Sequence, residues 1–244
     1  MLFGGEGLRK ELMPAWQRLR DRLAGATSQA VVVLTALAGH KVGIAERRGA
    51  LTAAALNKMG LDAGVVPVLT RAEADSPQVA AALASGQVIV LTGGDARALV
   101  EVLGSSAAWA AIQEAHCQGA ALVAGGGAAV ALGERAFAPQ QPVPPELDRL
   151  AFECFNGMGL LPRTLILPYA DWVQPAVLSQ IASTCALEAH LVALDSAAAL
   201  IADSSGWNVE GPGGVTVWEQ NGQQHSIPAG MRVPDGLLPP YPMR

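Results

Sequence analysis

A run of three glycines lies where an apolar segment gives way to a helix-forming one. Between Ala121 and Glu134 the chain reads ALVAGGGAAVALGE, with the glycines at residues 125–127. A sharp turn between a strand and a helix is how α/β enzymes present a nucleophilic side chain. The stretch contains no serine, cysteine or threonine. The sequence therefore predicts the turn without the group that such a turn presents.

The histidines show no pattern of metal ligands. His40, His116, His190 and His225 are widely separated, so we expect no metal site, and no motif indicates a cofactor. His40 follows an apolar segment and could reach the strand ends where α/β folds bind ligands. The alternative for His40 is a solvated loop residue.

The cysteines are odd in number and widely spaced. Cys117, Cys154 and Cys185 form no C-x-x-C pair, so we expect buried free thiols, since free cysteine commonly behaves as a small apolar residue. Cys117 precedes the strand that leads into the glycine run. It is therefore not a displaced nucleophile.

Composition excludes several classes of protein. Of the 244 residues, 51% are hydrophobic and 15% charged, which argues against extensive disorder. A net charge of −5 indicates neither a nucleic-acid-binding protein nor one that binds anionic membranes. The start of the chain lacks the pattern of a secretory signal, and no apolar run approaches the roughly 20 residues of a membrane span. We therefore expect a cytoplasmic protein.

Apolar, β-rich segments alternate with alanine-rich helical ones from Val31 to Leu132. Such alternation predicts a parallel sheet with helices on both faces. Gly60 is placed to end the helical segment at 45–60. The expected strands are 30–37, 63–69, 87–95 and 120–127, and the expected helices are 45–60, 76–86 and 96–119.

The pattern changes after Glu134. The proline-rich residues 138–146 predict an exposed loop, residues 161–169 a strand and residues 174–189 a helix. Four short strand-like segments follow as a C-terminal β-meander, with Asn221-Gly222 as a hairpin turn. We expect the tail at 233–244 to pack on the surface or on a neighbouring chain. We find no domain boundary, and the expected fold is a single three-layer αβα domain over residues 1–244.

The order of these segments resembles the cyanophycinase and dipeptidase E family of serine peptidases. The resemblance implies a fold like that of class I glutamine amidotransferases, with a mostly parallel, flavodoxin-like sheet. It rests on segments in the family's order: LFGGEG, VIVLTGGDARALVEVL, GAALVAGGGAAVALGE, NGMGLLPRTLILPY, VALDSAAALIAD and GPGGVTVW.

Against this family the chain lacks catalytic groups. The family's elbow reads G-x-S-x-G, and the resemblance places Gly127 at the serine and Ala129 at the closing glycine. Glycine carries no side chain, so no acyl-enzyme can form at Gly127. Tyr169 stands where the family has its histidine, and a phenol is a poor proton acceptor at pH 7.

The third member of the triad has no single counterpart, and the family's basic residues are missing. Glu146 and Glu153 both remain candidates for the acidic member, and each has the alternative of an ordinary surface carboxylate. No basic residue other than His190 and His225 stands between Arg163 and Arg232, where the family has several arginines. Binding of aspartyl substrates is therefore not expected.

Backbone groups could outlast the lost side chains. In the family, the amide after the nucleophile and amides of the Gly-Gly turn form the oxyanion hole. The matching amides belong to Ala128 and to Gly93 or Gly94. They could still hold a small anion or a peptide carboxylate, in contact with the Tyr169 hydroxyl. The alternative is that the glycines serve only a tight turn and close packing.

Our leading hypothesis is a catalytically degenerate relative of these peptidases that acts by binding or assembly, as a homodimer. A second hypothesis is a hydrolase that uses other groups, such as Tyr169, Asp95 or His40. A third is a structural partner of a related active subunit.

Overall fold

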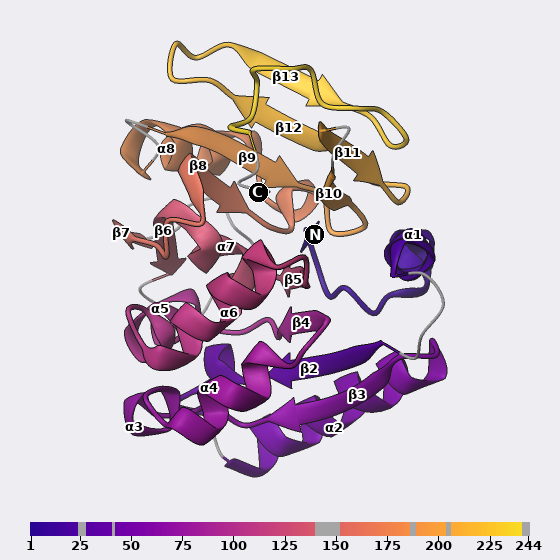
Figure 1. Cartoon of the computed structure of the whole chain (residues 1–244). Coiled ribbons are helices and arrows are strands. Elements are labelled where there is room, and N and C mark those ends of the chain that lie inside the picture. Colours follow the sequence, from indigo (N-terminus) through magenta and orange to yellow (C-terminus); the bar gives the residue numbers. More distant parts are fainter. Residues whose placement is uncertain (24–27, 41, 140–151, 186–188, 204–205, 241–244) are drawn as a thin grey trace.

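The computed structural model describes residues 1–23, 28–40, 42–139, 152–185, 189–203 and 206–240. Within these ranges the strands form two sheets, one of seven strands and one of six, here named sheet A and sheet B (Figure 1). No helix in these ranges is long and apolar enough to cross a membrane.

Sheet A has the strand order β11-β10-β1-β5-β4-β2-β3. The five strands from β1 to β3 in this order are parallel, whereas β10 and β11 join antiparallel beside β1. Its strands are β1 (Leu2–Phe3), β2 (Gln29–Val33), β3 (Asp62–Val66), β4 (Val88–Leu91), β5 (Ala121–Gly125), β10 (Ala199–Asp203) and β11 (Gly206–Glu210).

Sheet A is covered on both faces because its strands are apolar on both sides. On β4, Val88 and Val90 pack in one core cluster with residues of α1 and α2, whereas Ile89 and Leu91 pack in the other with residues of α4 to α7. The helices are α1 (Met13–Arg22), α2 (Val42–Lys58), α3 (Arg71–Ala74), α4 (Pro77–Ala84), α5 (Ala96–Leu103), α6 (Ala107–Cys117), α7 (Gly127–Leu132) and α8 (Pro175–Cys185), with short 3-10 turns η1 (Lys10–Leu12), η2 (Thr35–Leu37) and η3 (Ala170–Trp172).

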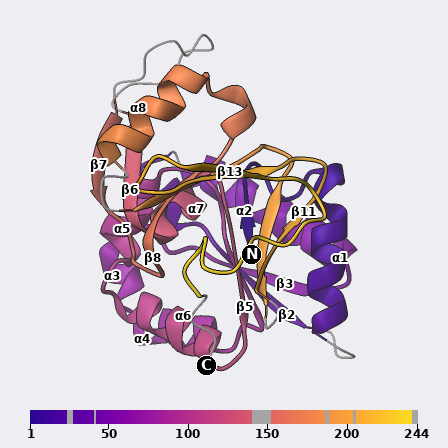
Figure 2. The ribbon, with the colours of Figure 1, turned by 90° about the horizontal axis from the view of Figure 1, so that it is seen from above.

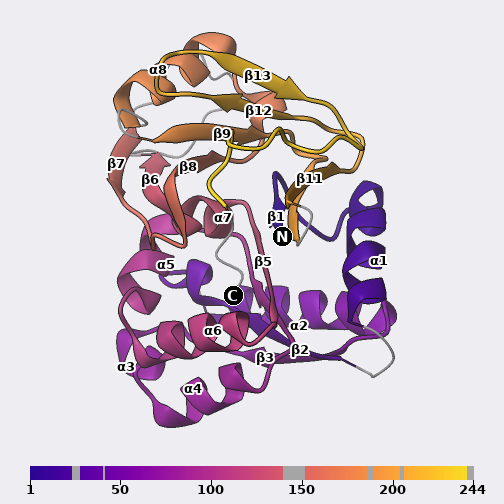
Figure 3. The ribbon, with the colours of Figure 1, turned by 45° about the horizontal axis from the view of Figure 1, so that its top comes forward.

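Sheet B has the order β13-β12-β9-β8-β6-β7. Strands β6, β8 and β9 are parallel to one another, and the outer strands are antiparallel. Helix α7 lies between β5 of sheet A and β6 and β8 of sheet B (Figure 3), so it joins the two sheets. The strands are β6 (Gly133–Pro139), β7 (Phe152–Asn156), β8 (Leu161–Leu167), β9 (His190–Leu194), β12 (Val215–Trp218) and β13 (Gln224–Ile227).

The expected α/β fold with a mostly parallel sheet is confirmed, and so are its local signals. Helix α2 ends at Lys58, after which Gly60 adopts φ +86° and the Leu61 N–H donates to the Leu56 carbonyl at 3.2 Å. Gly222, at φ +84°, turns the chain between β12 and β13 as predicted. Residues 140–146 of the expected proline-rich loop lie outside the described ranges.

The C-terminal meander does not form one sheet, in contrast to the expectation. Strands β9, β12 and β13 belong to sheet B, whereas β10 and β11 belong to sheet A. The chain crosses between the sheets at residues 195–198 and packs closely on Gly4. A Cβ on Gly4 would overlap the Asp195 carbonyl oxygen. The tail then packs on this chain itself, with Leu237 and Leu238 buried and the Pro239 carbonyl accepting from the Trp207 indole at 3.0 Å.

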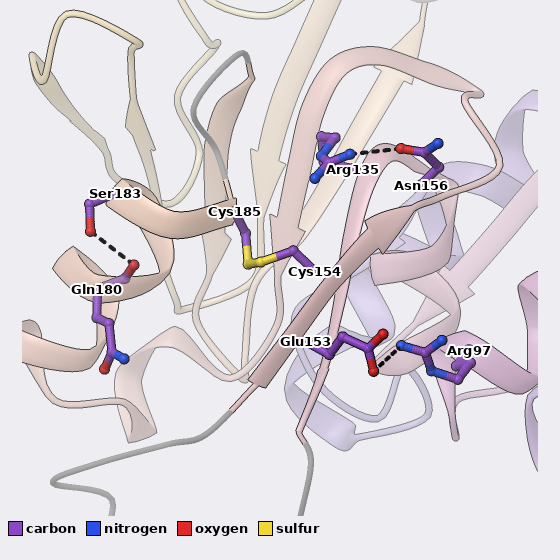
Figure 4. Close-up of a disulfide and its surroundings, with 8 residues drawn as sticks. All are labelled: Arg97, Arg135, Glu153, Cys154, Asn156, Gln180, Ser183 and Cys185. Carbon is purple, nitrogen blue, oxygen red and sulfur yellow. Dashed lines mark hydrogen bonds and ion pairs between the residues drawn. A yellow bond between two sulfur atoms is a disulfide. The ribbon is translucent and has the colours of Figure 1, made fainter.

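Two of the three cysteines form a disulfide, so the expectation of free thiols is wrong for them. Cys154 on β7 is bonded to Cys185 at the last residue of α8, with their Cα atoms 5.5 Å apart (Figure 4). Cys117 is free but exposed, not buried. The pairing could not be read from the sequence because the two residues lie 31 positions apart and meet only when α8 packs beside β7. In Figure 2, α8 and β7 lie on the side of the molecule opposite α1.

We expect Cys185→Ser to lower the free energy of unfolding by about 3–4 kcal/mol, the loop-entropy value for a closed loop of this length. Urea denaturation of the oxidised wild type, the reduced wild type and the variant measures it, with Cys117→Ser as the control. Native oxidised protein should also show a single reactive thiol, which Cys117→Ser removes. Equal midpoints for oxidised and reduced protein would contradict the prediction.

Candidate functional site

The carboxyl ends of β1, β4 and β5 meet at one edge of sheet A and border a cavity of about 560 Å³, here named the polar cleft. This is the edge at which parallel α/β sheets bind ligands. The loops after β4 and β5, helix α2 and Tyr169, two residues beyond β8, complete its walls. Its polar lining residues are Glu6, Arg48, Thr52, Thr92 and Tyr169, its glycines are Gly5, Gly7, Gly93, Gly94, Gly125, Gly126 and Gly127, and its other lining residues are Phe3, Leu8, Trp16, Leu51, Val90, Leu91 and Val123.

The turn between β5 and α7 is made by Gly126. Gly125 ends the strand, Gly127 begins the helix, and Gly126 between them has φ 54° and ψ −132°. L-residues rarely adopt this conformation, so it marks the strained position of the turn. A Cβ on Gly126 would make only ordinary van der Waals contacts, 3.8 Å from the Gly93 Cα and 3.9 Å from Cε2 of Tyr169. A side chain at this position would therefore face Tyr169.

Gly127, the position singled out by the sequence motif, has a different environment. A Cβ built there would overlap the carbonyl oxygen of Gly94. The same two loops approach closely at Gly93, whose Cβ would lie 3.1 Å from the Gly125 carbonyl oxygen. Glycine is thus required at residue 127 by backbone packing, and the residue placed at the turn is the one before it.

Tyr169 is held by the backbone at the end of β8. Its φ of 57° is left-handed, and its N–H donates to the Gly4 carbonyl at 2.7 Å, which ties the β8 loop to the β1 loop. Its ring packs on Trp172 with centroids 4.9 Å apart. Burial raises the pKa of the Tyr169 phenol above its ordinary value, and the Glu6 carboxylate adds to the rise. At neutral pH the phenol is therefore a hydrogen-bonding group and not a base.

The charged groups of the polar cleft lie on the β1 loop and on α2. The Arg48 guanidinium is 3.5 Å from the Glu6 carboxylate, and both side chains are exposed. The charges of Arg48 and Arg9 lower the pKa of Tyr169, against burial and Glu6, so all three charges act on the phenol.

Asp95 and His40 are not brought to the polar cleft. The Asp95 carboxylate caps α5, accepting from the Arg97 N–H at 2.8 Å and the Ala98 N–H at 3.4 Å. His40 is exposed and lines neither cavity described in this section. The alternative of a solvated loop histidine is therefore the one that the structure supports.

The other histidines also lie away from this edge. Nδ1 of His116 is 2.6 Å from the Ala120 carbonyl oxygen, at the opposite end of the strands. His225 contacts Glu219 at 2.6 Å in the β12–β13 hairpin, and His190 begins β9. Over the described ranges, no group of three His, Cys, Asp or Glu residues could hold a metal ion.

Of the two acidic candidates, only Glu153 can be placed. It lies on β7 and forms an ion pair with Arg97 of α5, 2.8 Å apart (Figure 4), and it lines neither cavity. Arg97 also stacks over the Phe155 ring at 4.5 Å. Glu146 lies outside the described residues. Glu153 thus has a structural partner and no histidine to orient.

A second cavity adjoins the polar cleft, and sequence reasoning missed it. It measures about 500 Å³ and is named here the apolar chamber. Its walls come from α5, α7, β6, β8, η3 and α8, segments that no sequence motif connects. The lining residues are Gly94, Asp95, Ala96, Gly127, Val130, Phe137, Ala138, Pro139, Leu167, Pro168, Tyr169, Trp172, Val173, Val177 and Ile181.

Comparison with known proteins identifies the fold. No family model matches the chain, and no curated protein matches its sequence. A crystal structure of a peptidase from an acI-B1 Actinobacterium superposes with a TM-score of 0.78 at 20% identity, over 95% of this chain and 94% of that one. A peptidase E candidate from Listeria monocytogenes EGD-e superposes with a TM-score of 0.61 at 14% identity, over 86% and 96%. The chain therefore shares the α/β fold of these two proteins.

The two glycines of the turn should respond differently to alanine. We expect Gly127→Ala to lower the free energy of unfolding by about 3 kcal/mol or more, because backbone must move to admit the Cβ. Gly126→Ala should cost about 1–2 kcal/mol, from conformational strain alone. Urea denaturation measures both, with Gly43→Ala on α2 as the control, since open space surrounds Gly43 and alanine favours helix. A larger loss at residue 126 than at 127 would contradict the assignment.

The raised pKa of Tyr169 predicts a dependence of stability on alkaline pH. The fold favours the neutral phenol, so this contribution is complete below the ordinary value of 10.0 and is lost as pH rises through the folded pKa. We expect Tyr169→Phe to flatten the fall in unfolding free energy above pH 10. The difference between the ultraviolet titrations of wild type and variant reports the ionisation directly; a Tyr169 midpoint below 10 would refute this.

Proposed function

We propose that this chain is a non-catalytic binding protein built on a peptidase fold, which holds a small carboxylate-bearing ligand in the polar cleft. The observation that carries the proposal is the empty turn. Gly126 stands where the fold would present a nucleophile, a Cβ there would fit without a clash, and the nearest side chain is the neutral phenol of Tyr169. A nucleophile and a base are therefore both missing from the place where hydrolysis needs them.

This proposal moves the lost nucleophile from Gly127, where motif alignment puts it, to Gly126. The supporting argument is geometric, because a nucleophile must occupy the strained turn and project into the cleft. Gly126 has that backbone conformation, whereas any side chain on Gly127 would collide with Gly94. The amide after the nucleophile is then that of Gly127, with that of Ala128 next along the helix.

The groups that remain suit an anion. The N–H groups of Gly127 and Ala128 belong to the first turn of α7 and so have no acceptor within the helix. Gly93 and Gly94 border the same cleft, and Arg48, which also lines it, supplies a positive charge that acts on the Tyr169 phenol. A carboxylate is the ligand that guanidinium and amide donors both favour.

The alternative of a hydrolase with other catalytic groups has little support. Tyr169 and Asp95 both line the apolar chamber, but the Asp95 carboxylate caps α5, and His40 is exposed outside both cavities. Chemistry by these three would need them around one bound substrate. The place of His40 and the capping role of Asp95 weigh against it.

Assembly remains part of the proposal. We propose a homodimer, with α2 as a candidate contact because Ile44 and Leu51 are exposed and lie seven residues apart on one face of the helix, where Leu51 also borders the polar cleft. Sedimentation of wild type and an Ile44→Ser/Leu51→Ser variant tests this. A structural role beside an active related subunit is the other form of assembly.

The location of the protein is also a proposal. A cytoplasmic site was expected from sequence, but the Cys154–Cys185 disulfide is of a kind typical of oxidising compartments. Alkylation of thiols at the moment of cell lysis, followed by mass measurement, distinguishes the reducing cytoplasm from an oxidising compartment. Blocking of all three cysteines would place the protein in a reducing environment.

Restoring two groups tests descent and inactivity together. We expect the wild type to release no aspartate from Asp-Leu and the single variant Gly127→Ser to be equally inert. Gly126→Ser combined with Tyr169→His should hydrolyse p-nitrophenyl acetate at least about tenfold above wild type, because serine and histidine then face each other.

The matched control is Gly127→Ser combined with Tyr169→His, which carries the same two side chains with the serine one residue along. Its serine would collide with the Gly94 carbonyl, so no gain is expected. Cleavage of Asp-Leu by the wild type, lost in Tyr169→Phe, would overturn the non-catalytic proposal. A gain in the pair that carries Gly127→Ser, but not in the pair that carries Gly126→Ser, would restore the original alignment.

A further inference from the structure

The polar cleft and the apolar chamber share a boundary that consists of the backbone of two glycines and one side chain. Of the residues described as lining them, Gly94, Gly127 and Tyr169 border both cavities. Two of these have no side chain, so the phenol ring of Tyr169 is the one side chain on the shared boundary. A ligand seated beside Tyr169 in the polar cleft is therefore next to the chamber.

The chamber is built for an apolar group. Its side chains include Val130, Phe137, Leu167, Val177 and Ile181, all of them buried. The lining residues with ionisable side chains are Tyr169 and Asp95. The Asp95 carboxylate already accepts two N–H bonds at the start of α5. Water in such a cavity finds few hydrogen-bond partners, so an alkyl or aryl group would replace it favourably.

The polar cleft supplies charge at the other side of Tyr169. The charges that act on the phenol are those of Arg48, Arg9 and Glu6, a net positive set. Glu11 approaches Arg9 only at 3.9 Å, between exposed side chains, so it screens that charge weakly. The two cavities therefore place a net positive charge on one side of Tyr169 and an apolar space on the other.

We propose that the ligand of this site is a monocarboxylate with an unbranched alkyl chain, its carboxylate near Arg48 and the Tyr169 hydroxyl and its chain in the apolar chamber. This rests on the proposed function above and names its ligand class. An alkyl chain fits better than a peptide, because the chamber walls offer few polar side chains and buried peptide groups would lose their hydrogen bonds.

A homologous series from acetate to octanoate tests the proposal by titration calorimetry. We expect each methylene that enters the chamber to lower Kd about fourfold, from the transfer free energy of a buried CH₂, until the chamber is filled. Octylamine should not bind comparably. A Kd that is independent of chain length, or equal binding of octylamine, would overturn the proposal.

Fluorescence locates the chain. Trp172 is 63% exposed, packs on the Tyr169 ring and lines the chamber, so octanoate should change its emission whereas acetate should not. The signal is the difference between wild type and Trp172→Phe. An octanoate-induced change that persists in Trp172→Phe places the chain elsewhere and overturns the proposal.

Variants that fill the chamber distinguish binding in the chamber from binding in the polar cleft. Val173→Trp should weaken octanoate binding at least about tenfold and leave acetate binding unchanged, whereas Arg48→Met should weaken both. Val79→Trp, at a half-buried valine of α4 that lines neither cavity, is the matched control. Ala138→Leu, a smaller change in the same chamber, replaces Val173→Trp if that variant does not fold.

Failure of this inference and failure of the proposed function give different results. If carboxylates of every length bind with equal Kd, the cleft binds anions and the chamber is unused. If no carboxylate binds, or if Asp-Leu is the compound that binds and is cleaved, the proposed function itself fails.

Discussion

The structure depends on close contact between two backbone loops at the carboxyl edge of sheet A. The loop after β4 and the loop after β5 approach until the Gly94 carbonyl oxygen fills the place of a Cβ on Gly127, and Gly93 is nearly as close to Gly125. Only glycine permits such an approach without displacement of backbone. This contact sets the direction in which α7 leaves β5, and α7 in turn joins the two sheets.

The same contact explains how the turn keeps its shape without side chains. The turn is stabilised by backbone packing between Gly94 and Gly127. Tyr169 is likewise held by its backbone, through the bond from its N–H to the Gly4 carbonyl and through its ring on Trp172. Because both positions are held by backbone contacts, the cleft keeps its shape with glycine at residues 126 and 127 and tyrosine at residue 169.

Much of the architecture could be predicted because it follows from local pattern. The apolar runs that became β2, β4 and β5 are apolar on both faces, which a parallel sheet between helices requires. Gly60 and Gly222 turn the chain where residues tolerant of positive φ were expected. The division of the meander between two sheets could not be predicted, because β9 and β10 are both short apolar runs that suit either sheet. The disulfide, the exposure of Cys117 and the apolar chamber share this limit, since each depends on which distant segments pack together.

By itself the sequence determined that residues 125–127 carry no side chain and that residue 169 carries a phenol, which no folding could change. It determined the α/β class for the same local reason, since hydrophobic period and glycine position act within a few residues. Only the tertiary structure decided which glycine occupies the turn, because Gly126 and Gly127 are identical in sequence and differ in what surrounds them. A Cβ on Gly126 would meet Gly93 and Tyr169 at ordinary contact distance, whereas a Cβ on Gly127 would overlap the carbonyl of Gly94, a contact across more than thirty residues of chain.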